Sequence, residues 1–243
     1  MNVSIEDLRT FNTCPLLFEQ RGFYQERIDR SRILLRELGT VFNNLFYQTM
    51  RGRKINTARV GGYWKEAVKK AQEKHPDLGD KDFQFPAQCL AIFMDMYLKT
   101  ADDEEVVGPG VPFEVPISQN VIVQDVYPLL TRTNYGTRIT IFEFLPTILP
   151  DIHYSNDFFY SVYAHAYRRE FGKNEFSIRI CNLGDGKSVE LVKGESILKE
   201  HVSILESLGD ELSLEAHKVP SLSHCPSCVI STPCHVRRYA AKV

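Results

Sequence analysis

Several features that classify a protein at once are missing from this sequence. No apolar run approaches the length of a membrane span, and no charged-then-apolar leader precedes the first residues. Charge of one sign is scarce too: the formal net charge is −2 and the sequence pI is about 6.4, so no global positive field marks a nucleic-acid partner. We therefore expect no membrane partner, and cysteines in a chain without a leader favour the reducing cytoplasm.

The C-terminal region contains three cysteines in a pattern typical of a metal-binding loop. Cys225, Cys228 and Cys234 follow the spacing C-x2-C-x5-C, with two prolines between them and no periodic apolar run around them. Thiolates are soft ligands that suit zinc or iron–sulfur clusters, and both usually take four protein ligands. The tail supplies three, and Cys14 near the N-terminus is the best candidate for the fourth. A metal held by all four would join the two ends of the chain and stabilise the fold.

Other interpretations of the six cysteines are weaker. A disulfide framework is typical of small secreted domains, whereas this chain has 243 residues and no leader. Tetrahedral zinc is the main alternative to a [4Fe–4S] cluster, with His224 or His235 replacing a thiolate, but zinc ribbons usually bring two C-x2-C pairs. Free thiols are the third possibility. Cys89 and Cys181 lie in apolar runs, where a buried thiol behaves as a small hydrophobe.

The apolar periodicity divides the chain into three parts. Residues 1–107 are expected to be mainly helical, residues 108–220 to contain a sheet with further helices, and residues 221–243 to form the cysteine loop and a basic tail. With 43% hydrophobic residues the chain can fill one large core, so we expect a single domain over residues 1–243. The order of elements indicates an α/β or α+β domain around one mixed sheet flanked by helices.

Local signals place the individual elements. Ser4 and Asp7 form a capping box that opens the first helix, and Gly108-Pro109-Gly110 is expected to form a turn. Further helices are expected from residue 38 and over residues 62–74, 86–100, 155–171 and 193–208, and strands over residues 111–117, 121–130, 138–144, 175–182 and 188–192. Ser155 is the expected N-cap of its helix, and residues 134–136 the tip of a hairpin.

Basic residues gather in three short segments. The candidates for contact with nucleic acid are Arg27, Arg30, Arg51, Arg53, Lys54, Arg237 and Arg238. Most basic runs are solvated helix faces, and a ridge that faces phosphate is the alternative. Because the net charge is close to zero, a protein partner is as plausible as DNA.

The two ends of the chain resemble a known family. Ser4, Leu8, Phe11, Cys14, Pro15 and Phe18 form the pattern Ser-x3-Leu-x2-Phe-x2-Cys-Pro-x2-Phe, and it is joined to a terminal C-x2-C-x5-C. This combination resembles the PD-(D/E)xK nucleases with an iron–sulfur staple, namely the RecB/AddB C-terminal nuclease domain and related CRISPR-adaptation exonucleases. The resemblance covers nearly the whole chain and implies a restriction-endonuclease-like fold. It also implies a [4Fe–4S] cluster on Cys14, Cys225, Cys228 and Cys234.

The catalytic motifs of that family are degenerate here. Asn43 stands where the family has the histidine of Gly-x3-His, and Asp125 matches the metal-binding aspartate without its preceding glycine. Glu143 matches the second carboxylate, but Leu145 replaces the lysine, and only Tyr163 remains of Gln-x3-Tyr. Phosphodiester hydrolysis needs carboxylates that hold Mg²⁺ and a lysine that orients the attacking water and stabilises the developing charge. Leucine can do neither.

Two functions from different classes follow from this comparison. The first is a non-catalytic descendant that keeps the cluster and acts as a DNA-binding or scaffold component of a replication, repair or recombination assembly. The second is a metal-dependent DNA exonuclease with a variant site built on Asp125 and Glu143, which would bind Mg²⁺ only if active. We favour the first, with DNA or a protein of a nucleic-acid-processing complex as its partner.

Overall fold

The computed structural model describes residues 1–19, 30–53, 56–100, 104–172, 175–191 and 194–214. The helices are α1 (Ile5–Thr13), α2 (Pro15–Glu19), α4 (Arg30–Met50), α5 (Thr57–Lys74), α6 (Asp80–Thr100), α7 (Asp151–Asn156), α8 (Tyr160–Phe171) and α9 (Glu195–Ser213). The strands are β1 (Asn2–Val3), β2 (Glu105–Pro116), β3 (Ile122–Thr133), β4 (Gly136–Glu143), β5 (Phe176–Asn182) and β6 (Lys187–Leu191). None of the described helices combines the length and the apolar composition needed to cross a bilayer.

One mixed six-stranded sheet organises the described part of the chain. β2, β3 and β4 form an antiparallel meander, and β5 then runs parallel to β4 and antiparallel to β6. The parallel step from β4 to β5 needs a crossover connection, which α7 and α8 supply. The short β1 joins β3 in parallel.

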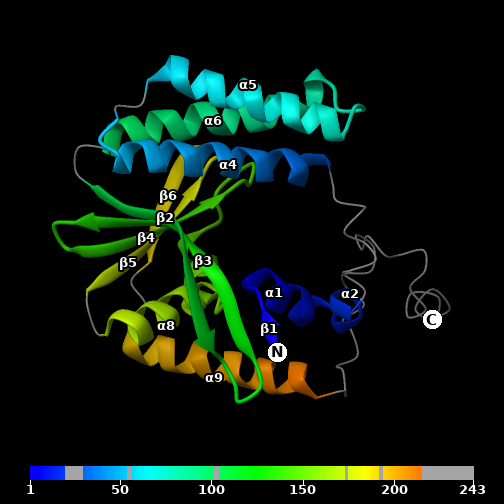
Figure 1. Cartoon of the computed structure of the whole chain (residues 1–243). Coiled ribbons are helices and arrows are strands. Elements are labelled where there is room, and N and C mark those ends of the chain that lie inside the picture. The colour runs from blue at the N-terminus through cyan, green and yellow to red at the C-terminus, as the bar shows by residue number, and fades with distance from the viewer. Residues whose placement is uncertain (20–29, 54–55, 101–103, 173–174, 192–193, 215–243) are drawn as a thin grey trace.

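The helices cover both faces of the sheet. Figure 1 shows α4, α5 and α6 on one face and α8 and α9 on the other, with α1 on the same side as α9. Phe42 stacks on Phe93 with 4.0 Å between ring centroids, and both pack with Leu129 of β3 and with Leu183, which follows β5, in the core under α4 and α6. A second core contains side chains from α1, α8, α9 and the opposite face of the sheet. The α/β class with a mixed sheet between helical layers is thus confirmed.

The first helix begins as the sequence predicts. Ser4 Oγ accepts from the Asp7 N–H at 3.0 Å, and Asp7 Oδ2 accepts from the Ser4 N–H at 3.0 Å. Leu8 and Phe11 then lie buried on one face of α1. The expected hairpin tip is also confirmed, because Thr133 pairs with Gly136 at the end of the β3–β4 ladder and Gly136 has a φ of 119°.

Three local predictions are wrong. Gly108-Pro109-Gly110 is not a turn but lies inside β2, where a register shift and a φ of 59° at Gly110 provide an irregularity of the kind that glycine permits. Ser155 is not an N-cap but lies within α7, because the expected single helix is interrupted at residues 157–159, between α7 and α8. The second helix, α4, begins at Arg30 and therefore includes part of the basic segment.

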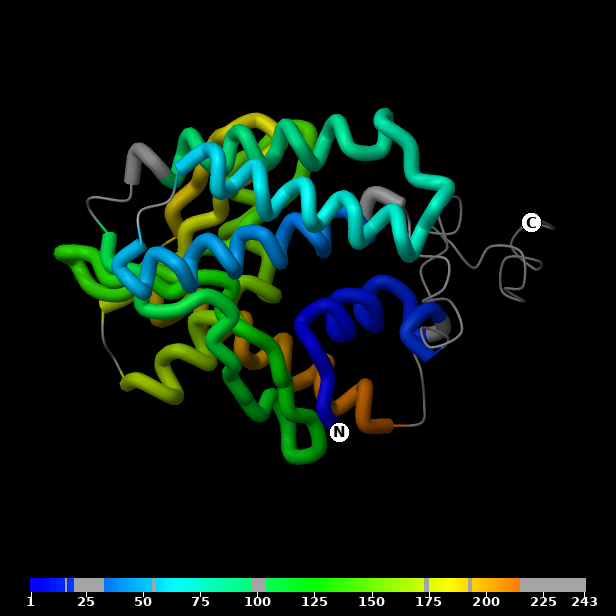
Figure 2. Tube along the Cα trace, turned by 45° about the horizontal axis from the view of Figure 1, so that its top comes forward, coloured from blue at the N-terminus to red at the C-terminus, as the bar shows by residue number. Residues whose placement is uncertain are grey.

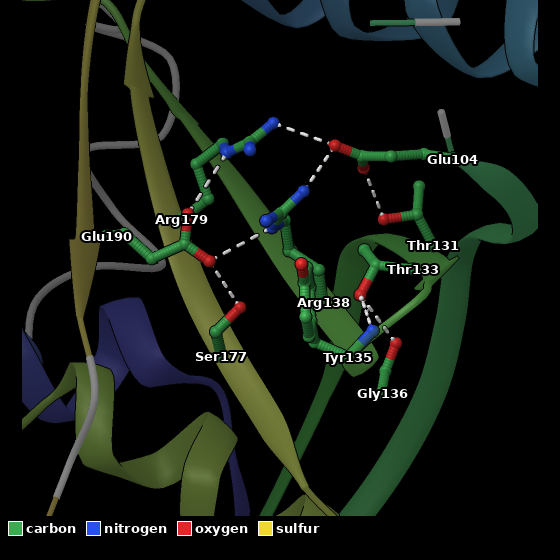
Figure 3. A network of polar contacts seen from close by, with 9 residues as sticks. All are labelled: Glu104, Thr131, Thr133, Tyr135, Gly136, Arg138, Ser177, Arg179 and Glu190. Atoms are coloured by element: carbon green, nitrogen blue, oxygen red, sulfur yellow. Dashed lines mark hydrogen bonds and ion pairs between the residues drawn. The ribbon is translucent and has the colours of Figure 1, made fainter. Parts of the chain in front are cut away.

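A charged network connects the strands on the face of the sheet that α4 and α6 cover (Figure 3). Glu104 precedes β2 and accepts from Arg138, from Arg179 at 3.0 Å and from the Thr131 hydroxyl at 2.7 Å. Glu190 on β6 accepts from Arg138 at 3.1 Å. The Glu104 side chain is 11% exposed, so its partners are largely shielded from water. A single carboxylate therefore joins β3, β4 and β5 to the start of β2.

Neutralising this carboxylate should be costly, whereas neutralising its neighbour should not. In the Glu104→Gln variant Arg138 and Arg179 lose one of their two carboxylate partners and keep Glu190, and we expect a loss of about 1.5–3 kcal/mol in the free energy of unfolding. Glu105 is the matched control, because it pairs with Arg132 at 3.0 Å while both side chains are 68% exposed. Glu105→Gln should change stability by less than about 0.5 kcal/mol. Urea denaturation followed by circular dichroism measures both, and equal losses would contradict the assignment.

Candidate functional site at the fork between β3 and β4

β3 changes its neighbour on one edge part of the way along its length. β2 pairs with the whole of β3 on the opposite edge. The other edge pairs with β1 at Ile122 and Val123, and then with β4 from Leu129 to Thr133. Between these two ladders β3 and β4 diverge and leave a fork in the sheet, and Asp125 lies in this part of β3.

The two carboxylates predicted from the sequence point to the same face of the sheet. Asp125 lies midway between Val123 and Tyr127, which are both buried in the core with α1, α8 and α9. Glu143 is the last residue of β4 and follows Ile141, which is buried in that same core. Since side chains alternate between the faces of a strand, both carboxylates point toward the layer of α1, α8 and α9.

Asp125 serves as a hydrogen-bond acceptor for the start of α1. Its Oδ2 accepts from the Ile5 N–H at 2.9 Å, and its Oδ1 accepts from the Val126 N–H at 2.8 Å. Ile5 is the first residue of α1, so its N–H has no partner within the helix, and a negative charge at this end also suits the helix dipole. Burial raises the pKa of the nearby Tyr163, and the charge of Asp125 raises it further.

Glu143 makes its contact with α8. The Tyr160 hydroxyl donates to Glu143 Oε1. Burial raises the pKa of Tyr160, and this hydrogen bond raises it further, so the phenol stays protonated as a donor at neutral pH. Tyr154 of α7 has a raised pKa as well, first because of burial and in part because of Glu143. The carboxylate therefore joins the end of β4 to the crossover helices.

An arginine completes the group. Arg9 of α1 forms an ion pair with Asp157 at 3.2 Å, and its guanidinium lies 5.2 and 5.1 Å from the ring centroids of Phe159 and Tyr160. Burial would lower the pKa of Arg9, but Asp157, Tyr160 and Glu143 outweigh that effect and raise it. The guanidinium is thus a fixed positive charge, and it cannot act as a general acid.

The segment after β4 is held by backbone hydrogen bonds. Leu145, at the position of the family's lysine, donates its N–H to Asn182 Oδ1 at 2.9 Å, and the Ile148 N–H donates to Asp185 Oδ2 at 2.9 Å. Burial would raise the pKa of Asp185, but hydrogen bonds from the Ile148 and Lys187 amides and from the Asn182 side chain lower it overall. A Cβ on Gly184 would lie 1.7 Å from the Leu145 carbonyl oxygen, so only glycine allows this approach. The turn between β5 and β6 therefore fixes the chain where a catalytic lysine would be expected.

The contacts of the fork do not suit a magnesium ion. Within the described residues, no group of three or more His, Cys, Asp or Glu side chains is arranged to hold a metal. Asp125 and Glu143 already accept hydrogen bonds from the protein, and Mg²⁺ demands near-octahedral oxygen ligands at short distance. Any ion would share these carboxylates with the Ile5 and Val126 amides and the Tyr160 hydroxyl. As they stand, the two carboxylates connect β3 to α1 and β4 to α8.

Cys14 is the one expected cluster ligand within the described residues. It follows the last residue of α1, where its N–H donates to the Thr10 carbonyl at 2.8 Å, and it is half-buried. Cys225, Cys228 and Cys234, and the alternative ligands His224 and His235, lie outside the described residues, so the cluster stays a prediction.

The two remaining cysteines are buried, as predicted. Cys89 of α6 and Cys181 of β5 are 0% and 4% exposed. Burial raises the pKa of the Cys89 thiol to about 11 and that of Cys181 to about 12. Both thiols stay protonated at neutral pH, and metals bind the thiolate, so neither residue is suited to be a ligand.

The other predicted site residues are not brought to the fork by any contact in the described chain. Asn43 is exposed on α4, and Arg51 and Arg53 are exposed directly after it, where Arg53 donates to Gln48 at 2.9 Å. Arg30 is the first residue of α4. The Arg30 side chain, together with Arg27, Lys54, Arg237 and Arg238, lies outside the described part.

Arg9, Asp157 and Tyr160 belong to the site but were not predicted from the sequence. One local signal existed for Arg9, because it is the only basic residue among the first twenty. Tyr160 lies one helical turn before Tyr163, on the same side of α8. Asp157 gives no local signal, since its partner Arg9 is 148 residues away.

Comparisons with known proteins give no independent assignment for this chain. Neither a family model nor a curated protein matches the sequence. The role of the fork is therefore inferred from its own contacts.

Removing the Asp125 carboxylate should weaken the attachment of α1. Asp125→Ala leaves the Ile5 N–H without its acceptor, and we expect a loss of about 1–2 kcal/mol in the free energy of unfolding. Asp151→Ala is the control, because Asp151 is an exposed aspartate in the first turn of α7 without a hydrogen bond to its side chain in the described chain. Hydrogen exchange should show faster exchange of the α1 amides in the Asp125 variant alone. Unchanged exchange would contradict the anchoring role.

Proposed function

We propose that this protein is a catalytically degenerate relative of the PD-(D/E)xK nucleases, acting as a DNA-binding or scaffold component of a replication, repair or recombination assembly. The restriction-endonuclease-like fold, the [4Fe–4S] cluster and the nucleic-acid-processing partner are all parts of this proposal. The order of a helical layer, a three-strand meander, a crossover helix and a parallel strand is compatible with such a fold.

The observation that supports a non-catalytic role is the use of both carboxylates as structural acceptors. A two-metal or one-metal hydrolase needs carboxylate oxygens that face the substrate and hold the ion. Here Asp125 accepts the first amide of α1, and Glu143 accepts the Tyr160 hydroxyl. The same two residues that would bind Mg²⁺ in a nuclease thus hold the layer of α1 and α8 against the sheet.

The group next to Glu143 also cannot replace the missing lysine. A catalytic lysine must reach the attacking water or the phosphoryl oxygens with a donor that is not engaged elsewhere. The Arg9 guanidinium is stacked on two rings and paired with Asp157 at 3.2 Å. Leu145 contributes only its backbone N–H, which is bonded to Asn182.

The proposed cluster has a stabilising role in this arrangement. Cys14 ends the helix whose first amide is held by Asp125. A cluster that joins Cys14 to the three tail cysteines would close a loop that contains almost the whole chain, and closing a long loop removes much of the entropy of the unfolded state. Its chemistry would be that of a staple, in which the four thiolates of Cys14, Cys225, Cys228 and Cys234 hold the cluster.

A nuclease assay separates the proposed function from the alternative enzyme. Purified, cluster-loaded protein should leave labelled single- and double-stranded DNA intact with Mg²⁺ or Mn²⁺, and neither ion should raise its melting temperature. Asp125→Ala and Glu143→Ala variants should behave in the same way as the parent in the cleavage assay. Degradation that is abolished by Asp125→Ala would overturn the proposal and establish a metal-dependent exonuclease.

An iron analysis tests the cluster. Protein purified without oxygen should contain about four iron atoms per chain, and Cys14→Ala should lose them and lower the melting temperature. The Cys89→Ala variant is the control, because Cys89 is fully buried in α6 and should leave the iron content unchanged. Zinc in place of iron, or full iron content in the Cys14 variant, would contradict the ligand set.

A further inference from the structure

Charge is unevenly distributed between the α4–α5 hairpin and α9. The described side chains of α4, the turn after it and α5 include eight basic residues and three acidic ones. The basic residues are Arg36, Arg51, Arg53, Arg59, Lys65, Lys69, Lys70 and Lys74, all of them exposed, and we name this set the basic ridge. By contrast, α9 carries five acidic residues and a single lysine. The near-neutral total therefore conceals a locally basic hairpin and a locally acidic helix.

The α4–α5 hairpin spreads the basic ridge along its length. α5 lies farthest from the sheet in Figure 1, and Figure 2 shows it running beside α4. The two helices are antiparallel, because Lys74 at the end of α5 lies 3.8 Å from Glu37 near the start of α4. Arg51 and Arg53 are consequently close to the start of α5. With 18 residues, α5 is about 27 Å long.

Much of this charge is not neutralised within the described chain. Arg36, Arg51 and Lys65 form no ion pair with any described residue. Lys69 and Lys70 pair with Glu73 and Glu66 of their own helix, at 3.9 and 2.8 Å, but these are exposed pairs. Exposed pairs contribute little energy and are easily exchanged, so both lysines can turn to an external anion.

The fork, in contrast, is a poor place for phosphate. Its described side chains include three carboxylates, Asp125, Glu143 and Asp157, and one cation, Arg9. Without a bound metal this excess of negative charge repels a phosphodiester. If this protein binds nucleic acid, we therefore expect the contact to lie on its surface away from the fork.

We propose that the basic ridge binds the phosphate backbone of double-stranded DNA without sequence preference. This inference rests on the proposed function. Single-strand binders stack successive bases on several exposed aromatic side chains. Among the described residues of α4 and α5 only Tyr47, which is 49% exposed, is open in this way, because Tyr63 and Trp64 are partly buried in the helical layer. A helix of this length can follow about 8 base pairs of duplex at 3.4 Å per step.

Salt-dependent binding of a fluorescent duplex to the cluster-loaded chain tests the site. In the triple variant Lys65→Gln, Lys69→Gln, Lys70→Gln we expect binding weakened by roughly tenfold or more. The slope of log K against log salt is negative, and its magnitude should decrease by about 1 for each lysine that contacts phosphate. The loss should be equal for duplexes of unrelated sequence.

A matched pair of lysines provides the control. Lys69 and Lys199 are both 78% exposed, and each pairs with a glutamate of its own helix four residues away, at 3.9 Å for Glu73 and 3.3 Å for Glu195. Lys69→Gln should lower the salt slope by about 1, and Lys199→Gln should leave it unchanged.

Two results would overturn the inference, and they can be told apart. Equal effects of Lys69→Gln and Lys199→Gln, with the wild type still binding duplex, would reject the basic ridge and leave the proposed function standing. A wild type that binds no DNA at any salt would reject the ridge together with the DNA-binding part of the proposed function. Binding to phosphatidylserine vesicles without any binding to DNA would count as this second result.

Discussion

The contact between Asp125 and the first amide of α1 determines where the N-terminal segment lies. β1 pairs with the first residues of β3, Ser4 and Asp7 cap the helix from within, and the Ile5 N–H then bonds to Asp125 at 2.9 Å. These contacts set the position and direction of α1. Arg9 and Cys14 are carried by this helix and the residue after it, so the ion pair with Asp157 and the place of the expected cluster ligand both depend on the same anchor.

At the fork, the hydrogen bonds of two carboxylates hold α1 and α8 against the sheet. A carboxylate that binds a metal for catalysis must keep lone pairs directed at the ion and tolerate its exchange. Asp125 and Glu143 instead receive donors from α1 and α8, and burial keeps the Tyr160 phenol protonated with a raised pKa.

Local features of the sequence predicted local structure well, but the sequence did not predict the long-range contacts. The Ser4–Asp7 capping box and the hairpin tip before Gly136 involve residues within three positions of each other, so their signals survive without the fold. Arg9 and Asp157 are 148 residues apart, and no local pattern connects them. The glycines at 108 and 110 show the intermediate case: they mark irregular backbone, but only the neighbouring strand decides between a turn and an irregular β2.

Net charge also gives no information about local surfaces, for the same reason. A total of −2 excludes a uniformly basic surface, but it says nothing about how the charges are distributed over the fold. Interactions between exposed charges fall off over about 8–10 Å in physiological salt, so a duplex lying on α5 would experience the lysines of that helix and little of the acidic α9. The proposed basic ridge would let a nearly neutral protein attract phosphate through one hairpin, while the carboxylates of the fork repel it.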